Sequence, residues 1–249
     1  MGDLAIIGGS GFSSMPELEI LDFRAVDTRY GSPSAHLIRG RLAGSDVVFL
    51  PRHGSGHAIP PHRINYRANI QALADAGVDR VIALAAVGGI ADDCGPLALC
   101  IPDQLVDYTH GRENTFYDGI DNDVVHVDFS YPYSASLRRQ LLDAARERGL
   151  AIRDGGTYAA TQGPRLETVA EIRRLQRDGC DLVGMTAMPE AALARERGIA
   201  YATLAFVVNW AAGKSDGEIG MEEINANLAR CAADVRGLLV ALASQPSLH

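Results

Sequence analysis

The chain has 249 residues, of which 47% are hydrophobic and 22% are charged, and its formal net charge is −8. This length and composition are typical of a globular protein with one large domain or two small ones. The acidic balance argues against nucleic acid as a main partner, because duplex binding needs a basic surface, but it allows a local basic pocket for a small anion.

Apolar runs and helical patterns alternate along the whole chain. The apolar runs predict strands over residues 4–7, 35–38, 47–50, 80–87, 99–106, 157–161, 181–184 and 200–208. Helical periodicity, capping residues and terminal glycines predict helices over residues 65–76, 134–148, 167–177, 189–197 and 221–242. No linker, repeat or low-complexity segment interrupts the alternation. We therefore expect one α/β domain over residues 1–249, with a mixed, mostly parallel central sheet flanked by helices.

Export, membrane and metal signals are missing from the sequence. No basic region followed by an apolar core and a cleavage site opens the chain, so we expect no signal peptide, and no apolar run could span a bilayer. The cysteines form no C-x-x-C pair and no zinc-like spacing with histidine; they are Cys94, Cys100, Cys180 and Cys231. We expect reduced, mostly buried thiols in a cytoplasmic protein without a metal site.

A glycine-rich turn from Gly8 to Gly11 follows the first predicted strand. Ser14 stands where a dinucleotide-binding pattern needs its third glycine, and no Lys-Ser/Thr pair follows, as a Walker-type loop would require. Two interpretations stay open. The turn needs glycine for steric reasons alone, or its backbone N–H groups and the Ser10 hydroxyl hold a phosphate.

Arg52 and His53 stand where the third predicted strand stops. A guanidinium fork beside an imidazole favours an oxyanion site, although a surface pair in a turn is the alternative. Two other strand ends carry compatible groups, the small Ala86 and the hydroxyl of Thr186. Ligands gather at the carboxyl ends of strands in open α/β sheets, so we expect one anion to be held by Ser10, Arg52, His53, Ala86 and Thr186.

Six segments together are specific for one family. They cover residues 7–11 (IGGSG), 51–54 (PRHG), 65–70 (NYRANI), 115–119 (TFYDG), 163–168 (GPRLET) and 185–190 (MTAMPE). Through them the chain resembles, over nearly its whole length, the trimeric purine nucleoside phosphorylases and methylthioadenosine phosphorylases. The resemblance implies a homotrimer that cleaves the N-glycosidic bond of a nucleoside, with inorganic phosphate as cosubstrate and with no cofactor or metal.

The resemblance also implies roles for single residues. Ser10, Arg52, His53, Ala86 and Thr186 match the family's phosphate-binding residues, and Ala85 stands beside Ala86 where the methylthioadenosine branch has threonine. Met185 matches the residue that lies against the ribose. His126 matches a residue that one subunit lends to the 5′ pocket of its neighbour. Leu166 and Ala211 belong to the matched substrate-binding set.

Three positions depart from the methylthioadenosine branch, which usually has a hydroxyl residue at the position of Glu167 and aspartate at the positions of Asn209 and Ala211. Glu167 and Asn209 are the two that bear on the base. Both follow the 6-oxopurine pattern instead. A carboxylate only accepts hydrogen bonds, so Glu167 would hold the N1–H of a 6-oxopurine and repel the N1 lone pair of adenine. Asn209 can donate to O6 and accept from N7–H. The alternative for Glu167 is an ordinary acid that the dipole of a following helix stabilises.

Met221 stands where ordinary nucleoside phosphorylases place a histidine for the 5′-hydroxyl. An apolar, adaptable methionine suits a methylthio group, although a core methionine of an amphipathic helix is the alternative. Our hypothesis is phosphorolysis of 5′-methylthioinosine, with Asn209, Glu167 and His53 as catalytic residues. A methylthioadenosine phosphorylase and an inosine/guanosine phosphorylase are close alternatives. A nucleoside-binding protein and a dinucleotide-dependent enzyme are further alternatives of other classes.

Overall fold

The computed structural model describes residues 3–12, 14–119 and 123–245. Among them the strands are β1 (Asp3–Gly8), β2 (Glu19–Arg24), β3 (Leu37–Leu42), β4 (Ser45–Pro51), β5 (Val78–Gly89), β6 (Leu99–Ile101), β7 (Gln104–Asp107), β8 (Arg153–Asp154), β9 (Thr157–Ala160), β10 (Leu182–Gly184) and β11 (Ala200–Trp210). The α-helices are α1 (Tyr66–Asp75), α2 (Ala135–Glu147), α3 (Val169–Arg177), α4 (Ala187–Glu196) and α5 (Met221–Ser244).

The strands form one sheet whose main path is β2-β3-β4-β1-β5-β10-β9-β7, with β11, β6 and β8 attached through β5. Parallel pairs join β1 to β4 and β5, β5 to β11, β9 to β7 and β10, and β6 to β8. The antiparallel pairs are β2–β3, β3–β4, β5–β10 and β6–β11. The expectation of an α/β fold with a mixed, mostly parallel sheet is confirmed.

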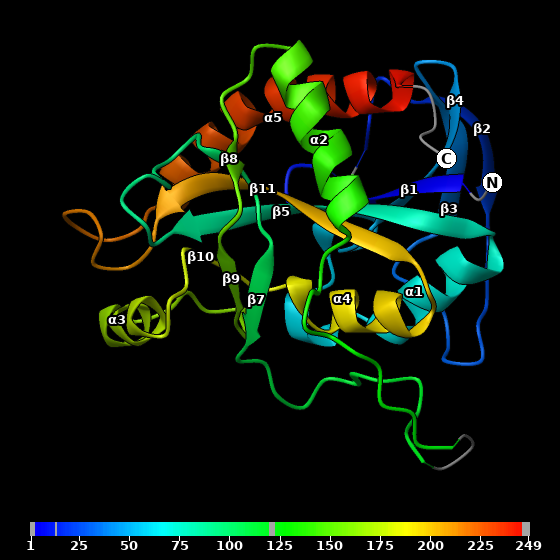
Figure 1. Ribbon diagram of the computed structural model, residues 1–249, viewed down its shortest axis with the longest axis horizontal. Coiled ribbons are helices and arrows are strands. Elements are labelled where there is room, and N and C mark those ends of the chain that lie inside the picture. The colour runs from blue at the N-terminus through cyan, green and yellow to red at the C-terminus, as the bar shows by residue number, and fades with distance from the viewer. Residues whose placement is uncertain (1–2, 13, 120–122, 246–249) are drawn as a thin grey trace.

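Helices cover both faces of the central strands β1, β5 and β11. Figure 1 shows α2 and α5 on one face and α1 and α4 on the other, while α3 lies beside β9 and β10. Successive side chains of a strand point to opposite faces. In β1, Ile6 therefore packs into the core under α5, and Ala5 and Ile7 pack into the core over α1 and α4. Burial on both faces explains why these strands are continuous apolar runs.

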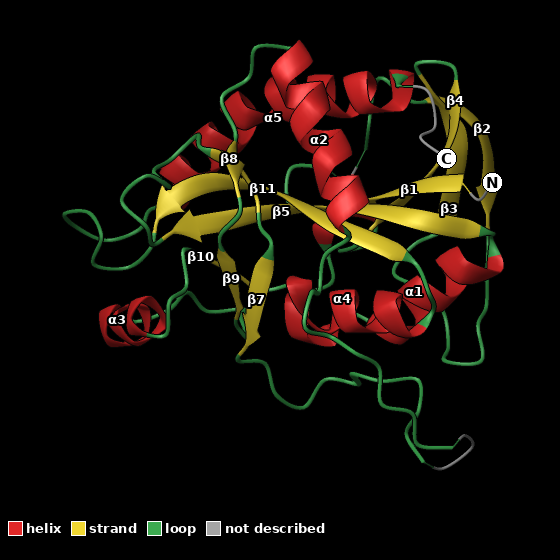
Figure 2. Ribbon diagram, in the orientation of Figure 1, coloured by secondary structure: helices red, strands yellow, loops and turns green. Residues whose placement is uncertain are grey.

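Parallel strands bring the carboxyl ends of β1, β4, β5 and β11 to one region of the sheet (Figure 2). Gly8 at the end of β1 lies opposite Pro51 at the end of β4, and Asn209 near the end of β11 lies opposite Gly88 of β5. Ser10, Arg52 and Ala86 follow or belong to these strand ends. The fold therefore places the motif-bearing loops together, as the sequence predicted.

The prediction lacks two of the strands and merges two others into one. β2 has no counterpart among the predicted strands, because all six of its residues are exposed and it has no buried face that would give an alternating pattern. The single strand expected over residues 99–106 is two strands, β6 and β7, because Pro102 offers no N–H and Asp103 turns the chain to bond Gly156. The short strand β8 also has no counterpart in the prediction.

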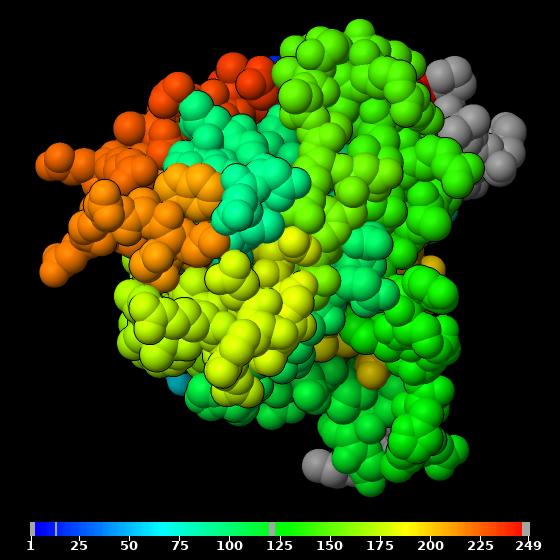
Figure 3. All heavy atoms as spheres, turned by 60° about the vertical axis from the view of Figure 1, so that its left-hand side comes forward, coloured from blue at the N-terminus to red at the C-terminus, as the bar shows by residue number. Residues whose placement is uncertain are grey.

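The expectation of mostly buried thiols is confirmed. All four cysteines are free and buried. None of the helices in the described residues is long and apolar enough to cross a membrane. The segment between β7 and α2 and the loop between β11 and α5 extend from the body; they appear green and orange in Figure 3.

Candidate active site

A cavity of about 600 Å³ lies at the carboxyl ends of β1, β4, β5, β10 and β11. Predicted site residues that line it are Ser10, Arg52, His53, Ala85, Ala86, Leu166, Glu167, Met185, Thr186, Asn209, Ala211 and Met221. His126 is exposed in the segment between β7 and α2 and does not line this cavity. The single chain thus gathers the whole predicted set except the residue that the resemblance assigns to a neighbour.

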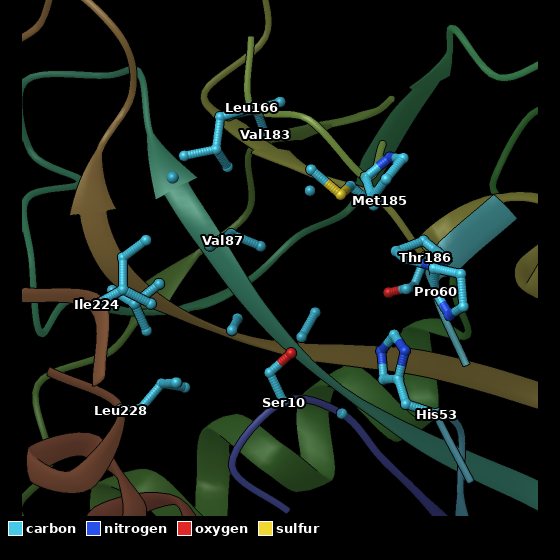
Figure 4. A pocket seen from close by; sticks show the side chains of 18 of the residues that line it. Ser10, His53, Pro60, Val87, Leu166, Val183, Met185, Thr186, Ile224 and Leu228 are labelled. Carbon is cyan, nitrogen blue, oxygen red and sulfur yellow. The ribbon is translucent and has the colours of Figure 1, made fainter. Parts of the chain in front are cut away.

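Polar groups gather at one end of the cavity. Figure 4 shows the side chains of Ser10, His53 and Thr186 facing the same space. A Cβ on Gly9 would lie 2.5 Å from the Leu84 carbonyl oxygen and 3.1 Å from Nη1 of Arg52. The glycine turn is therefore sterically required, and it also packs the Ser10 loop against Arg52. The steric interpretation of this turn is confirmed, and phosphate binding by its N–H groups and Ser10 stays a prediction.

Arg52 is buried, with 1% of its surface exposed, so the interpretation as a surface pair in a turn is wrong. Its Nε and Nη2 donate to the two carboxylate oxygens of Glu190 at 2.7 and 2.8 Å, and its Nη1 donates to the Leu84 carbonyl at 2.8 Å. The fork therefore faces Glu190. An anion in the cavity could accept hydrogen bonds only from the remaining N–H of Nη1 and the remaining N–H of Nη2, which these three bonds do not use.

Burial alone would lower the pKa of the Arg52 guanidinium, but the charge of Glu190 and its hydrogen bonds, with smaller contributions from Tyr201 and Tyr66, together raise that pKa above its ordinary value. Glu190 is itself buried and also accepts a bond of 2.8 Å from the Tyr201 hydroxyl. A fully hydrogen-bonded buried pair of this kind is costly to break, because the remaining charge has no partner. Glu190 therefore fixes Arg52 in one orientation.

His53 donates its Nδ1–H to the Ile59 carbonyl, with 2.8 Å between the atoms. Burial, followed by the charge of Arg52, lowers the pKa of His53 to about 4. The imidazole is thus neutral near pH 7 and its Nε2 carries a lone pair. The His57 ring lies 4.3 Å from the His53 ring, and its Nε2 is 3.5 Å from the Ser10 hydroxyl oxygen.

Glu167 lies at another end of the cavity, one residue before the N-cap of α3. The cap is Thr168, which forms a capping box with Glu171. Oε1 of Glu167 instead accepts a bond of 2.7 Å from the Thr161 hydroxyl. Burial raises the pKa of Glu167. Because Glu167 lines the cavity while Thr168 and Glu171 cap the helix, the geometry favours a role in the cavity over that of an ordinary helix-terminal acid.

Asn209 owes its position to an irregularity in β11. The register between β11 and β5 shifts between Val207 and Asn209, and such bulges often redirect side chains next to active sites. One N–H of the Asn209 amide donates to the Trp210 carbonyl at 2.7 Å. Its Oδ1 and second N–H remain outside that bond. Asn209 can therefore both accept and donate.

The third end of the cavity is apolar. Met221 begins α5 and is 62% exposed, so the interpretation as a core methionine is wrong. Ile224 and Leu228 follow it on α5, and Figure 4 shows both facing the cavity on the side away from His53. A second cavity of about 530 Å³ is lined by the same three side chains together with Ser10, His57 and Asn225. This end suits an uncharged, apolar substituent.

Sequence reasoning missed three polar residues at the site, namely Thr161, Glu190 and Arg112. Arg112 donates to the carbonyls of Met185 and Met188 at 2.8 and 2.6 Å and to that of Gln162 at 2.8 Å. It therefore ties the segment that carries Met185 to the segment that leads to Glu167. Nothing in the sequence around Arg112 signals this role. Glu190 falls within a matched segment, but its contact with Arg52 spans 138 positions.

A metal centre has no evident place in the described residues, in which no group of three or more histidine, cysteine, aspartate or glutamate side chains could hold an ion. The arrangement combines a polar end with Ser10, His53 and Thr186, a hydrogen-bonding end with Glu167 and Asn209, and an apolar end around one cavity. A phosphate, a purine and a 5′-substituted ribose would need such a combination.

The model of the family described as the phosphorylase superfamily matches residues 3–244. The chain belongs to the phosphorylase superfamily. A curated relative from Xanthomonas campestris, named a probable S-methyl-5′-thioinosine phosphorylase, is 53% identical over 241 residues, which cover 96% of each chain. A relative from Thermococcus kodakarensis, named a probable 6-oxopurine nucleoside phosphorylase, is 45% identical and covers 96% of this chain and 91% of its own.

Solved structures agree with this membership. A methylthioadenosine phosphorylase from Schistosoma mansoni in complex with adenine superposes with a TM-score of 0.94 at 32% identity. The match covers 98% of this phosphorylase and 91% of that chain. The resemblance found in the sequence is therefore confirmed, and the fold is that of the nucleoside phosphorylases.

Proposed function

We propose that this phosphorylase cleaves 5′-methylthioinosine with inorganic phosphate, giving hypoxanthine and 5-methylthio-α-D-ribose 1-phosphate. The observation that carries the proposal is the placement of Glu167 and Asn209 in a cavity whose opposite end is polar and whose third end is apolar. The names of the relatives that are 53% and 45% identical support a 6-oxopurine base.

The reaction exchanges two bonds at the anomeric carbon. A phosphate oxygen forms a bond to C1′, and the bond between C1′ and N9 of the purine breaks with its electrons leaving on the base. Ser10, His53 and Thr186 would hold the phosphate, and Met185 would lie against the ribose. The base takes up a proton at N7 from solvent as the bond between C1′ and N9 breaks, and the phosphate releases its own proton to solvent once its oxygen is bound to C1′. Asn209 would accept a hydrogen bond from that N7–H and donate one to O6. These contacts strengthen as charge moves onto the base, so they favour the transition state.

The apolar wall of Met221, Ile224 and Leu228 supports a methylthio group at the 5′ position. A hydroxyl there would lose hydrogen bonds with water and gain none from these side chains. Phosphorolysis of inosine and guanosine is the second candidate, because Glu167 and Asn209 read only the base. Phosphorolysis of methylthioadenosine is a third candidate, which the acceptor-only Glu167 disfavours.

We further propose a homotrimer in which His126 of one subunit reaches the 5′ end of the neighbour's cavity. Val124, Val125 and Tyr131 surround His126 in sequence and are exposed apolar side chains, as expected of a segment that another chain covers. The buried free thiols support a cytoplasmic location. The whole chain, residues 1–249, would work as one domain, without nucleic acid, cofactor or metal.

The affinity for phosphate should change little above about pH 8. Neutral His53 presents a lone pair at Nε2, which can accept a hydrogen bond from the P–OH of the phosphate monohydrogen dianion. The complex therefore holds the same number of protons as neutral His53 and that free dianion. Because the pKa of His53 is lowered to about 4, the imidazole does not titrate in this range, and we expect a nearly constant KM for phosphate between about pH 8 and about pH 9. A KM that rises by about tenfold over this pH unit would show that binding requires an additional proton and would contradict this role of His53.

The reaction class is tested by following hypoxanthine release from 5′-methylthioinosine with and without phosphate. We expect release only when phosphate is present, together with stoichiometric 5-methylthioribose 1-phosphate. Release of free 5-methylthioribose would indicate a hydrolase, and binding without release would indicate a nucleoside-binding protein. Either result would overturn the proposal.

A further inference from the structure

We propose that Thr161 is a specificity-determining positioning residue, whose hydroxyl keeps Glu167 an ionised hydrogen-bond acceptor and thereby excludes 6-aminopurines. The proposal rests on the proposed function, because it assumes that Glu167 reads the N1 edge of the base. Thr161 itself does not line the cavity and would act only through Glu167.

The position of Thr161 is fixed by the sheet. It follows the last residue of β9, and its backbone N–H donates to the Gly184 carbonyl of β10 at 2.8 Å. Its hydroxyl oxygen lies 2.7 Å from Oε1 of Glu167 and 3.3 Å from that same carbonyl oxygen. The shorter distance indicates that the hydroxyl donates its hydrogen bond to the carboxylate rather than to the carbonyl. Glu167 thus accepts a hydrogen bond from a donor that is fixed in position at the end of β9.

The charged groups around Glu167 do not supply an equivalent partner. Arg165 is exposed, and both of its terminal nitrogens bond Glu171, at 2.8 and 2.7 Å. Asn209 of β11 lines the same cavity as Glu167, but its side chain is a neutral amide. Glu167 also lines a further cavity, distinct from the two described above. The other titratable residues that line it are Asp107, Tyr108, His110, Arg165, Glu171 and Arg174. Within the described part of the chain, Thr161 is the side chain that donates a hydrogen bond to Glu167.

The protonation state of this carboxyl decides which base it can bind. An ionised Glu167 accepts from the N1–H of a 6-oxopurine and opposes the lone pair at N1 of a 6-aminopurine. A protonated Glu167 could donate its O–H to that same N1. Burial raises the pKa of Glu167 and the Thr161 hydroxyl opposes the rise. The preference for 6-oxopurines should therefore weaken in acid, and removing the hydroxyl should move this change to higher pH.

The test compares wild type with Thr161→Val, which keeps the shape and removes the hydroxyl, and with Thr161→Ser, which keeps the hydroxyl. The kcat/KM values for methylthioinosine and methylthioadenosine are measured at saturating phosphate from about pH 5 to about pH 9, a range that brackets the titration of a raised carboxyl. We expect the ratio of the two to fall in acid. The midpoint should move up by about one to two pH units in Thr161→Val and stay near wild type in Thr161→Ser. Thr157→Val on the same strand is the matched control.

Several results would overturn the role of Thr161. One is a constant ratio of the kcat/KM values for methylthioinosine and methylthioadenosine across this pH range in the wild type. This outcome can be measured without any variant. Another is a midpoint in Thr161→Val, or in Thr161→Ala if the valine variant does not fold, that equals the wild-type midpoint. Equal losses for both substrates at every pH would show a merely structural residue. A wild-type preference for methylthioadenosine at every pH would instead overturn the proposed function, so the two failures are distinguishable.

Discussion

Replacing Glu167 with serine and Asn209 with aspartate should turn this phosphorylase towards 6-aminopurines. The kcat/KM for methylthioinosine should fall on the order of hundreds-fold, because the variant leaves N1–H and O6 of the base without partners. The kcat/KM for methylthioadenosine should rise, because the introduced aspartate accepts from the 6-amino group and the carboxylate that opposed N1 is gone. Steady-state kinetics with both nucleosides at saturating phosphate measure the change in their ratio.

The matched control for this exchange is Glu222→Gln. Glu222 is an exposed acid beside Met221 at the other end of the cavity, so its replacement removes a negative charge without touching the base. We expect its substrate ratio to equal that of wild type. If the double variant loses activity towards both nucleosides in equal measure, base selection lies elsewhere in the cavity.

Replacing Glu190 with glutamine should destabilise the protein more than any exposed exchange. The variant leaves the buried Arg52 guanidinium without a counter-charge, and breaking a buried pair in this way costs about 3–5 kcal/mol of unfolding free energy. For a protein of this size we expect the Tm to fall by roughly 6–20 °C. Thermal unfolding followed by circular dichroism or calorimetry gives this shift.

Asp143→Asn provides the comparison for Glu190→Gln. Asp143 pairs with Arg146 on the outer face of α2, where 77% of the Arg146 side chain is exposed. Exposed pairs contribute at most about 1 kcal/mol, so its Tm should stay within a few degrees of wild type. Equal Tm values for the two variants would mean that the Arg52–Glu190 pair is not the stabilising contact that its burial indicates.

The sequence predicted the sheet and most of the cavity because their signals are local. Apolar runs mark β1, β5 and β11, which are buried on both faces, and glycine, arginine and hydroxyl residues directly follow the strand ends. Parallel pairing of β1 with β4 then brings Ser10 and His53 together, whereas Thr186 reaches the same cavity because β10 pairs antiparallel with the end of β5. The exposed edge strand β2 has no such signal, since its position depends only on pairing with β3.

The contacts that orient these residues could not be predicted from the sequence. The direction of the Arg52 fork depends on Glu190, and that of the Glu167 carboxyl depends on a threonine at the end of another strand. Both are side-chain bonds between different elements, and neither leaves a spacing pattern. A pattern predicts which groups reach the cavity, whereas packing determines which of their atoms are free to bind.

The most direct test of the account is a parallel measurement of kcat/KM for 5′-methylthioinosine, 5′-methylthioadenosine and inosine with phosphate near neutral pH. The account predicts that methylthioinosine is preferred over methylthioadenosine on the order of hundreds-fold, through Glu167 and Asn209, and is also preferred over inosine, through the apolar wall at Met221. A preference for methylthioadenosine would contradict the role of Glu167 and Asn209. Equal values for inosine and methylthioinosine would contradict the role of Met221.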